Sequence, residues 1–148
     1  MDKLLFNVEE AIAFSEEGRI EEWVHLFLNS VGDNPPFSEG LKLMERYWLG
    51  PILMDLDKVN RCCGPEEDIK YVEPVENWER HVTRMQQAIK KGWDMPPLII
   101  NHYDGYLEVS DGNHRHEALR REGIKKFWVI LWDSDHPDNL NKFQQDAV

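Results

Sequence analysis

The stretch Ser110-Asp111-Gly112-Asn113-His114-Arg115-His116 decides the fold, because it connects a predicted strand directly to a predicted helix. The strand covers Tyr106 to Val109, and the helix continues through Glu117 to its end at Gly123. Where a strand passes straight into a helix, several unpaired N–H groups and the positive end of the helix dipole lie at one place. The sequence therefore predicts an anion-binding loop.

The side chains of this loop suit phosphate oxygens. Gly112 allows a close approach of the backbone that any side chain would block, and Arg115 carries a planar fork of donors. His114 adds a further donor, while Asp111 is able to cap the helix or to hold Mg²⁺ on the phosphates. We expect Arg115 to serve a ligand rather than the fold. The same residues are also compatible with a polar turn whose His114 and Arg115 lie in solvent.

Strands surround the loop on both sides. Pro96-Pro97 precede Leu98–Ile100, a buried strand, and Asp104-Gly105 turns the chain into Tyr106–Val109, so the two strands form a hairpin. A final strand covers Phe127–Trp132. Residues 134–148 form a polar tail, at best a frayed helix.

The first fifty residues are predicted to be helical. Apolar residues recur at helical spacing between Val8 and Phe14 and again between Ile20 and Leu28. A third helix begins at Ser38, includes Tyr47 and Trp48, and is stopped by Gly50-Pro51. A short strand at Ile52–Leu56 and a helix from Trp78 to Gly92 complete the α+β pattern. We expect one domain over residues 1–148, with a helical extension (1–48), a core (49–133) and the tail.

Composition limits the partners. The chain has 148 residues, with 28 acidic and 17 basic residues and a net charge of −11, which disfavours duplex DNA but allows a small anion at a local positive site. Cys62 and Cys63 are adjacent, so we expect buried thiols and no disulfide. We see no signal peptide and no apolar run that spans a membrane, and we expect a cytoplasmic protein.

The segment from Leu49 to Asp133 resembles the ParB/sulfiredoxin superfamily, most closely at Pro97–Ile100 and at Asp111–Gly123. The resemblance implies a small mixed sheet with packed helices, to which the first helices are a family-specific extension. It also implies that a Gly-x-x-Arg loop at a helix N-terminus binds nucleotide phosphates. The nucleotide-binding residues would then be Gly112, Asn113, His114, Arg115 and His116, and ATP, ADP and CTP all remain open as the ligand.

The loop differs among the branches of this superfamily. Sulfiredoxins need a cysteine after the glycine, where Asn113 stands, and partition proteins have Gly-Glu-Arg-Arg and a downstream helix-turn-helix region. The free-serine kinase branch has Asp-Gly-His-His-Arg, which Asp111–Arg115 matches at four of five positions. Its Leu-x-Pro-His-Glu segment is similar to Val72–Glu76, which makes Glu76 a candidate catalytic carboxylate. Asn113 and Val75 each replace a histidine of that branch.

The leading hypothesis is a nucleotide-dependent phosphotransferase or phosphohydrolase that acts on a small molecule and uses Mg²⁺. Asp111 and Glu76 would be its catalytic residues, with Glu73 as the nearest competitor of Glu76. A regulatory nucleotide-binding module and a ParB-like nuclease are the alternatives. His102, His114 and His116 do not predict a metal site, because an arginine separates the last two. The acceptor and the oligomeric state stay open.

Overall fold

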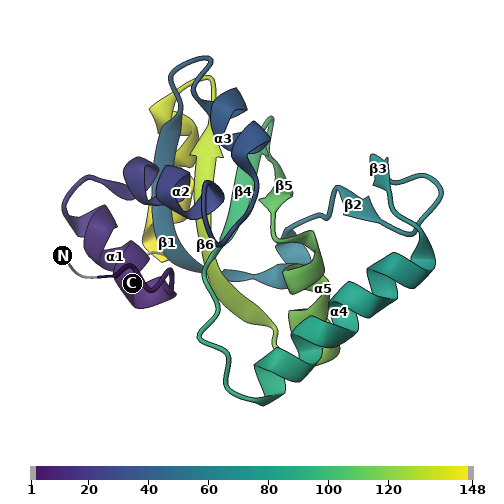
Figure 1. Cartoon of the computed structure of the whole chain (residues 1–148). Helices are drawn as coiled ribbons and strands as arrows, with labels where there is room; N and C mark the ends of the chain where they lie inside the picture. The colour runs from purple at the N-terminus through teal and green to yellow at the C-terminus, as the bar shows by residue number, and fades with distance from the viewer. Residues whose placement is uncertain (1–2, 147–148) are drawn as a thin grey trace.

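The computed structural model describes residues 3–146, and the chain follows the predicted order of helices and strands (Figure 1). Three short helices come first, a four-stranded sheet with two connecting helices follows, and a 3-10 helix closes the described chain. The elements are α1 Val8–Glu16, α2 Ile20–Leu28, α3 Pro35–Leu41, β1 Tyr47–Asp55, η1 Leu56–Lys58, β2 Cys63–Gly64, β3 Tyr71–Val72, α4 Val75–Lys90, β4 Leu98–Tyr103, β5 Tyr106–Asp111, α5 Asn113–Arg121, β6 Lys126–Asp133 and η2 Pro137–Asp146.

The main sheet is mixed, with the strand order β1-β6-β4-β5. Strand β6 pairs antiparallel with β1 and parallel with β4, while β4 and β5 form an antiparallel hairpin. At the tip of the hairpin, Asp104 and Gly105 both have positive φ, 51° and 78°, as a two-residue type I′ turn requires. The α+β class, the hairpin and the last strand are therefore confirmed.

The predicted third helix is wrong in its second half. Helix α3 ends at Leu41, and Tyr47 and Trp48 belong to β1. Gly50 does not stop a helix; it lies in a strand, where the pairing with β6 changes register between Leu49 and Ile52. A Cβ on Gly50 would lie 2.6 Å from the carbonyl oxygen of Val129, so only glycine fits beside β6.

The sheet is covered on both faces, because its central strands alternate between two apolar clusters. Ile99 and Ile130 point toward α1–α3, where they meet Trp23 and Leu28. Their neighbours point the opposite way and pack with Leu119 of α5: Leu98, Ile100, Val129 and Leu131. Figure 1 shows α1–α3 on one side of the sheet and α4 and α5 on the other.

Helices α4 and α5 pack against each other (Figure 1). Trp78 and Val82 of α4 and Ala118 of α5 are buried in this contact. The predicted polar tail is more ordered than expected, since Leu140 of η2 is buried in the main cluster. Residues 147–148 of that tail lie outside the described residues. Within residues 3–146, no helix combines the length and the apolar character needed to cross a membrane.

Candidate functional site

The predicted loop lies where expected, with Gly112 as the single residue between β5 and α5. Gly112 has φ 111° and ψ 26°, and no side chain caps the helix. A Cβ at this position would lie 2.7 Å from Cδ2 of Leu98 and 2.9 Å from Nη2 of Arg115. The positive φ and these close contacts both require glycine at this position. The first amides of α5 have no intrahelical acceptor.

The side chain of Arg115 is buried, contrary to our expectation that it serves only a ligand. Its Nη1 donates to the carbonyl oxygens of Pro96 (2.7 Å) and Pro97 (3.2 Å), and its Nη2 donates to Oδ2 of Asp111 (3.1 Å). Burial lowers the pKa of the guanidinium, although Asp111 opposes the shift, and the side chain stays charged because arginine does not deprotonate in proteins. Three of its five N–H groups are used, which leaves two for a ligand.

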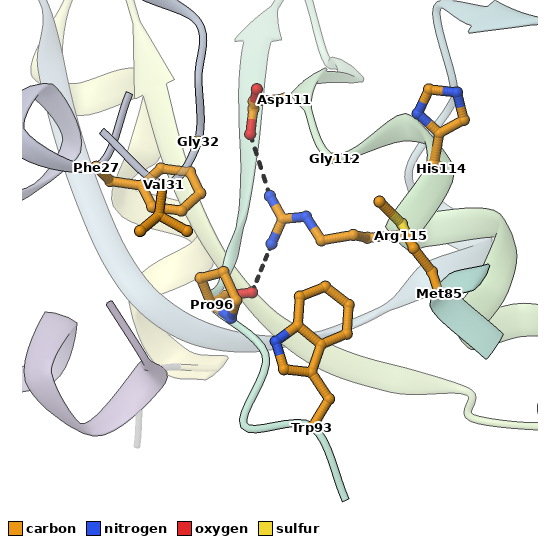
Figure 2. A pocket seen from close by; sticks show the side chains of 10 residues that line it. All are labelled: Phe27, Val31, Gly32, Met85, Trp93, Pro96, Asp111, Gly112, His114 and Arg115. Carbon is orange, nitrogen blue, oxygen red and sulfur yellow. Dashed lines mark hydrogen bonds and ion pairs between the residues drawn. The ribbon is translucent and has the colours of Figure 1, made fainter. Parts of the chain in front are cut away.

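A cavity of about 240 Å³ opens beside this arginine (Figure 2). One part of its wall is polar and consists of the loop residues Asp111, Gly112, His114 and Arg115. The other part is largely apolar and comes from distant segments: Phe27, Val31, Gly32, Met85, Trp93 and Pro96. Figure 2 shows Arg115 between Asp111 and Pro96, with Trp93 and Phe27 on the sides of the cavity. The cavity therefore combines an anion-binding end with an apolar end.

Two of the predicted nucleotide-binding side chains face away from the cavity. The Oδ1 of Asn113 accepts hydrogen bonds from the amides of Cys62 (2.9 Å) and Cys63 (3.2 Å). His116 is buried, and its Nε2 donates to the carbonyl oxygen of Leu56 at 2.9 Å. Both side chains therefore connect α5 to the segment that follows β1 through hydrogen bonds. At the helix N-terminus, Asn113 contributes only its backbone amide.

The side chain of His114 points from the loop toward Glu73. Its Nε2 lies 2.8 Å from Oε2 of Glu73, and Oε1 of Glu73 lies 3.3 Å from Nδ1 of His81. Burial raises the pKa of Glu73, but the hydrogen bonds and charges of His114 and His81 outweigh it, so the pKa of this carboxyl lies below its usual range. The ring of Trp78 on α4 packs against the ring of His114, with their centroids 4.7 Å apart.

Glu76 is exposed on the first turn of α4 and is not among the residues that line the cavity. The carboxylate that meets the loop is Glu73, the competitor named from the sequence. The two cysteines are free, as expected, with Cys62 buried and Cys63 half-buried. Burial and the nearby charge of Glu73 raise the pKa of the Cys63 thiol to about 11, so Cys63 is a neutral thiol in this environment.

Sequence reasoning missed the residues that give the cavity its apolar wall. Phe27 and Val31 belong to the helical extension, and Trp93 precedes Pro96-Pro97 in the connection to β4. The available signal was Trp93 itself, a large apolar side chain in the connection between a predicted helix and a predicted strand. His81 was also missed, since its nearness to His114 depends on how α4 packs on α5.

No protein-family model matches the chain, and no curated protein matches it either. Similar solved structures include a conserved hypothetical protein from Pyrococcus furiosus, with 16% identity and a TM-score of 0.43, over 61% of this chain and 34% of that chain. Sulfiredoxin from Arabidopsis thaliana has 18% identity and a TM-score of 0.38, over 55% of this chain and 84% of that one.

A mutant of a free serine kinase in complex with AMP has 16% identity and a TM-score of 0.40, over 54% of this chain and 30% of that chain. A Pnob8-like ParB-N domain is also similar. The chain spans about a third of the length of the Pyrococcus protein and of the kinase. A sulfiredoxin and a ParB-N domain, after which the superfamily of the sequence resemblance is called, are thus among the similar structures. What the site does follows from its own residues.

Proposed function

We propose that this chain binds a nucleotide in the cavity beside Arg115, with the phosphates at the N-terminus of α5. The observation that carries the proposal is the composition of the cavity wall. Free backbone amides and a buried arginine lie at one end, and aromatic and aliphatic side chains lie at the other. A nucleotide has the same two parts, an anionic chain and a flat, largely apolar base.

The phosphates would be bound by fixed donors. The amides that follow Gly112 and the positive end of α5 favour an anion at this point. The two unused N–H groups of Arg115 add a charge that needs no reorganisation, because Pro96, Pro97 and Asp111 already hold the guanidinium in place. Each oxygen of Asp111 accepts one hydrogen bond, from Asn34 or from Arg115, and the side chain is partly exposed, so a free lone pair would bind a Mg²⁺ ion that bridges phosphate oxygens.

The base would lie against the apolar wall. Trp93 keeps 38% of its surface exposed and Val31 keeps 68%, so covering both with a flat ring removes apolar area from water. The volume of the cavity lies just below the range of roughly 300–1,000 Å³ that is common for whole ligands. We therefore expect one part of the nucleotide to be enclosed and the remainder to extend toward solvent, where a small-molecule acceptor could approach.

The proposed chemistry is phosphoryl transfer to that acceptor, or hydrolysis. Glu73 is a poor proton acceptor, because two histidines engage its oxygens and hold its pKa low. Glu76 is an exposed carboxylate on the first turn of α4, and the base role proposed for it rests on the similarity of Val72–Glu76 to the kinase segment. The proposal therefore keeps Glu76 as the base and Asp111 as the Mg²⁺ carboxylate.

Binding is tested by calorimetric titration with ATP, ADP, AMP and CTP, with and without Mg²⁺. We expect at least one of them to bind, and Trp93→Ala to weaken that binding by roughly tenfold through lost stacking. Tyr106→Ala is the matched control, since Tyr106 is 39% exposed and lies outside the cavity. The proposal fails if no nucleotide binds, or if both variants bind as the wild type does.

Turnover is tested separately with Glu76→Gln, by following nucleotide consumption with a panel of small hydroxyl-bearing acceptors that includes free serine. We expect nucleotide affinity to stay the same and turnover to fall by roughly 100-fold. Full turnover in Glu76→Gln excludes this carboxylate as the base. Nucleotide binding without turnover in the wild type would instead favour the regulatory module.

A further inference from the structure

Three metal-ligating side chains meet where β3, α4 and α5 come together. Glu73 follows β3, His81 lies on α4, and His114 is the second residue of α5. One ligand atom from each of the three lies within 4.8 Å of the others. The imidazole rings of His81 and His114 face each other edge to face, with their centroids 5.0 Å apart. The chain thus brings together two histidines and one carboxylate from three separate elements.

The spacing of these atoms suits a small divalent cation. Zinc binds imidazole nitrogen and carboxylate oxygen at about 2.0–2.2 Å, so two ligand atoms of a tetrahedral site lie roughly 3.3–3.5 Å apart. Oε2 of Glu73 lies 2.8 Å from Nε2 of His114, and Oε1 of Glu73 lies 3.3 Å from Nδ1 of His81. Small side-chain rotations would bring all three atoms to metal distance.

The backbone around the three ligands is well fixed. The amide of Glu73 donates to the carbonyl oxygen of Gly64 at 2.8 Å, and α4 begins at Val75, two residues later. Trp78, only 1% exposed, lies between α4 and α5 and packs against the ring of His114. Ligands on packed helices lose little freedom on binding, which favours a specific site over an accidental one.

The charges favour a cation as well. As metal ligands, two imidazoles and one carboxylate would together carry a charge of −1, and the whole chain carries −11. Two arginines lie near this group. Arg115 directs its guanidinium toward Pro96 and Asp111 (Figure 2). Arg61, which lies over the ring of Trp78, is paired with Glu66 at 2.6 Å. Imidazole ligands select zinc over magnesium and calcium, which prefer sites built of oxygen atoms.

We propose that Glu73, His81 and His114 bind one Zn²⁺ ion, with the fourth coordination position open to water or to a ligand oxygen. The inference does not rest on the proposed function, since it involves neither a nucleotide nor turnover. His114 also lines the cavity, so the ion would lie at its edge. The thiol of Cys63, 3.7 Å from Oε2 of Glu73, lies next to this group and is not counted among the ligands.

The test uses the full chain, stripped with a chelator and titrated with Co²⁺ and Zn²⁺ in the absence of nucleotide. We expect one ion per chain, a visible Co²⁺ spectrum typical of tetrahedral coordination, and displacement of Co²⁺ by Zn²⁺ but not by a large excess of Mg²⁺. His81→Ala should weaken binding by roughly 10- to 100-fold or more. The side chain of His81 is 40% exposed, so this variant should fold, and circular dichroism verifies that it does.

His136→Ala is the matched control, because the side chain of His136 is 62% exposed and lies outside the group. Glu73→Gln provides a second variant with little change of size, and it should weaken binding similarly. Equal affinity in the wild type and His81→Ala, or no specific binding in the wild type, would overturn the proposal and leave Glu73 hydrogen-bonded to two histidines. A thiolate-to-cobalt band that disappears in Cys63→Ser would overturn the three-ligand set.

Discussion

The guanidinium of Arg115 bonds to two backbone carbonyls and one carboxylate, and only 5% of the residue is exposed. Those acceptors belong to the connection before β4 and to the end of β5. Arginine can satisfy three such groups at once because its donors are fixed in one plane. Arg115 thus connects two chain segments through hydrogen bonds. Its remaining donors are proposed to bind a ligand.

Arg115→Ala should therefore destabilise the free protein by about 3 kcal/mol, because the variant leaves Asp111 and two buried carbonyls without their partner. Urea denaturation followed by circular dichroism measures the change. Arg120→Ala on the same helix is the control, since its side chain is 50% exposed and its partner Asp57 is 73% exposed. A stable Arg115→Ala protein would show that the guanidinium serves the ligand alone.

His116 gives the stability a dependence on pH. Burial lowers the pKa of His116 below its ordinary value of 6.5, so the unfolded chain takes up the proton first as the pH falls. The stability contributed by the neutral ring is fully present above 6.5 and is lost as the pH decreases toward the folded-state pKa. Low pH should therefore destabilise the protein.

His116→Gln should reduce that loss, since glutamine keeps an N–H donor for Leu56 but does not titrate. Denaturation curves at about pH 7.5 and about pH 5.5 compare the two proteins. The wild type should lose more unfolding free energy than the variant between these conditions. An identical loss in both would mean that other groups carry the pH dependence.

The roles of single residues were predictable only where they depend on local geometry. Gly112 could be recognised from its place between a strand and a helix, because the backbone there needs a positive φ whatever the rest of the chain does. The pairing of Glu73 with His114 and His81 could not, because it depends on the rotation of α4 against α5. The sequence alone therefore directed attention to Glu76, three residues further along.

At the scale of elements, the junction of β5 and α5 depends on the one glycine between them. We expect Gly112→Ala to cost about 2 kcal/mol, from the strained φ and from the contact with Leu98. Thermal or urea denaturation measures this cost. Gly40→Ala in α3 is the matched control, because no atom lies within 4 Å of its added methyl group. That variant should be neutral or gain up to roughly 1 kcal/mol.

The elements themselves were predictable where the apolar period was clear. Leu98–Ile100 and Phe127–Trp132 are buried runs, and both are strands. Tyr47 and Trp48 were assigned to a helix because they follow apolar residues at helical spacing and precede Gly50-Pro51. Their true partner is β6, about eighty residues later, where Tyr47 pairs with Asp133. A pairing at that distance leaves no local signal.

At the scale of the molecule, the helical extension and the core share one sheet. Asn34, which caps α3, donates to Oδ1 of Asp111 at 3.4 Å, and Phe27 of α2 forms part of the cavity wall. The extension therefore covers a face of the sheet and also completes the candidate site. The predicted boundary near residue 48 separates two layers of one structure.

This arrangement predicts cooperative unfolding. Ile130 and Leu131 are neighbours on β6 that point to opposite faces, and both are fully buried. Ile130→Ala and Leu131→Ala should each cost about 3 kcal/mol and leave a single transition. Hydrogen exchange should show α2 and α5 losing protection together in either variant. Loss of protection in α2 alone after Ile130→Ala would mean that the helical layer unfolds as a separate unit.

The strand order also has a consequence for how the protein is made. Strand β6 lies between β1 and β4, yet it is the last strand of the sheet to leave the ribosome. Until it is translated, β1 has no partner and the apolar side chains of α1–α3 have no complete sheet to cover. We therefore expect the four-stranded sheet to be completed, and the cavity to form, only after synthesis has passed residue 133.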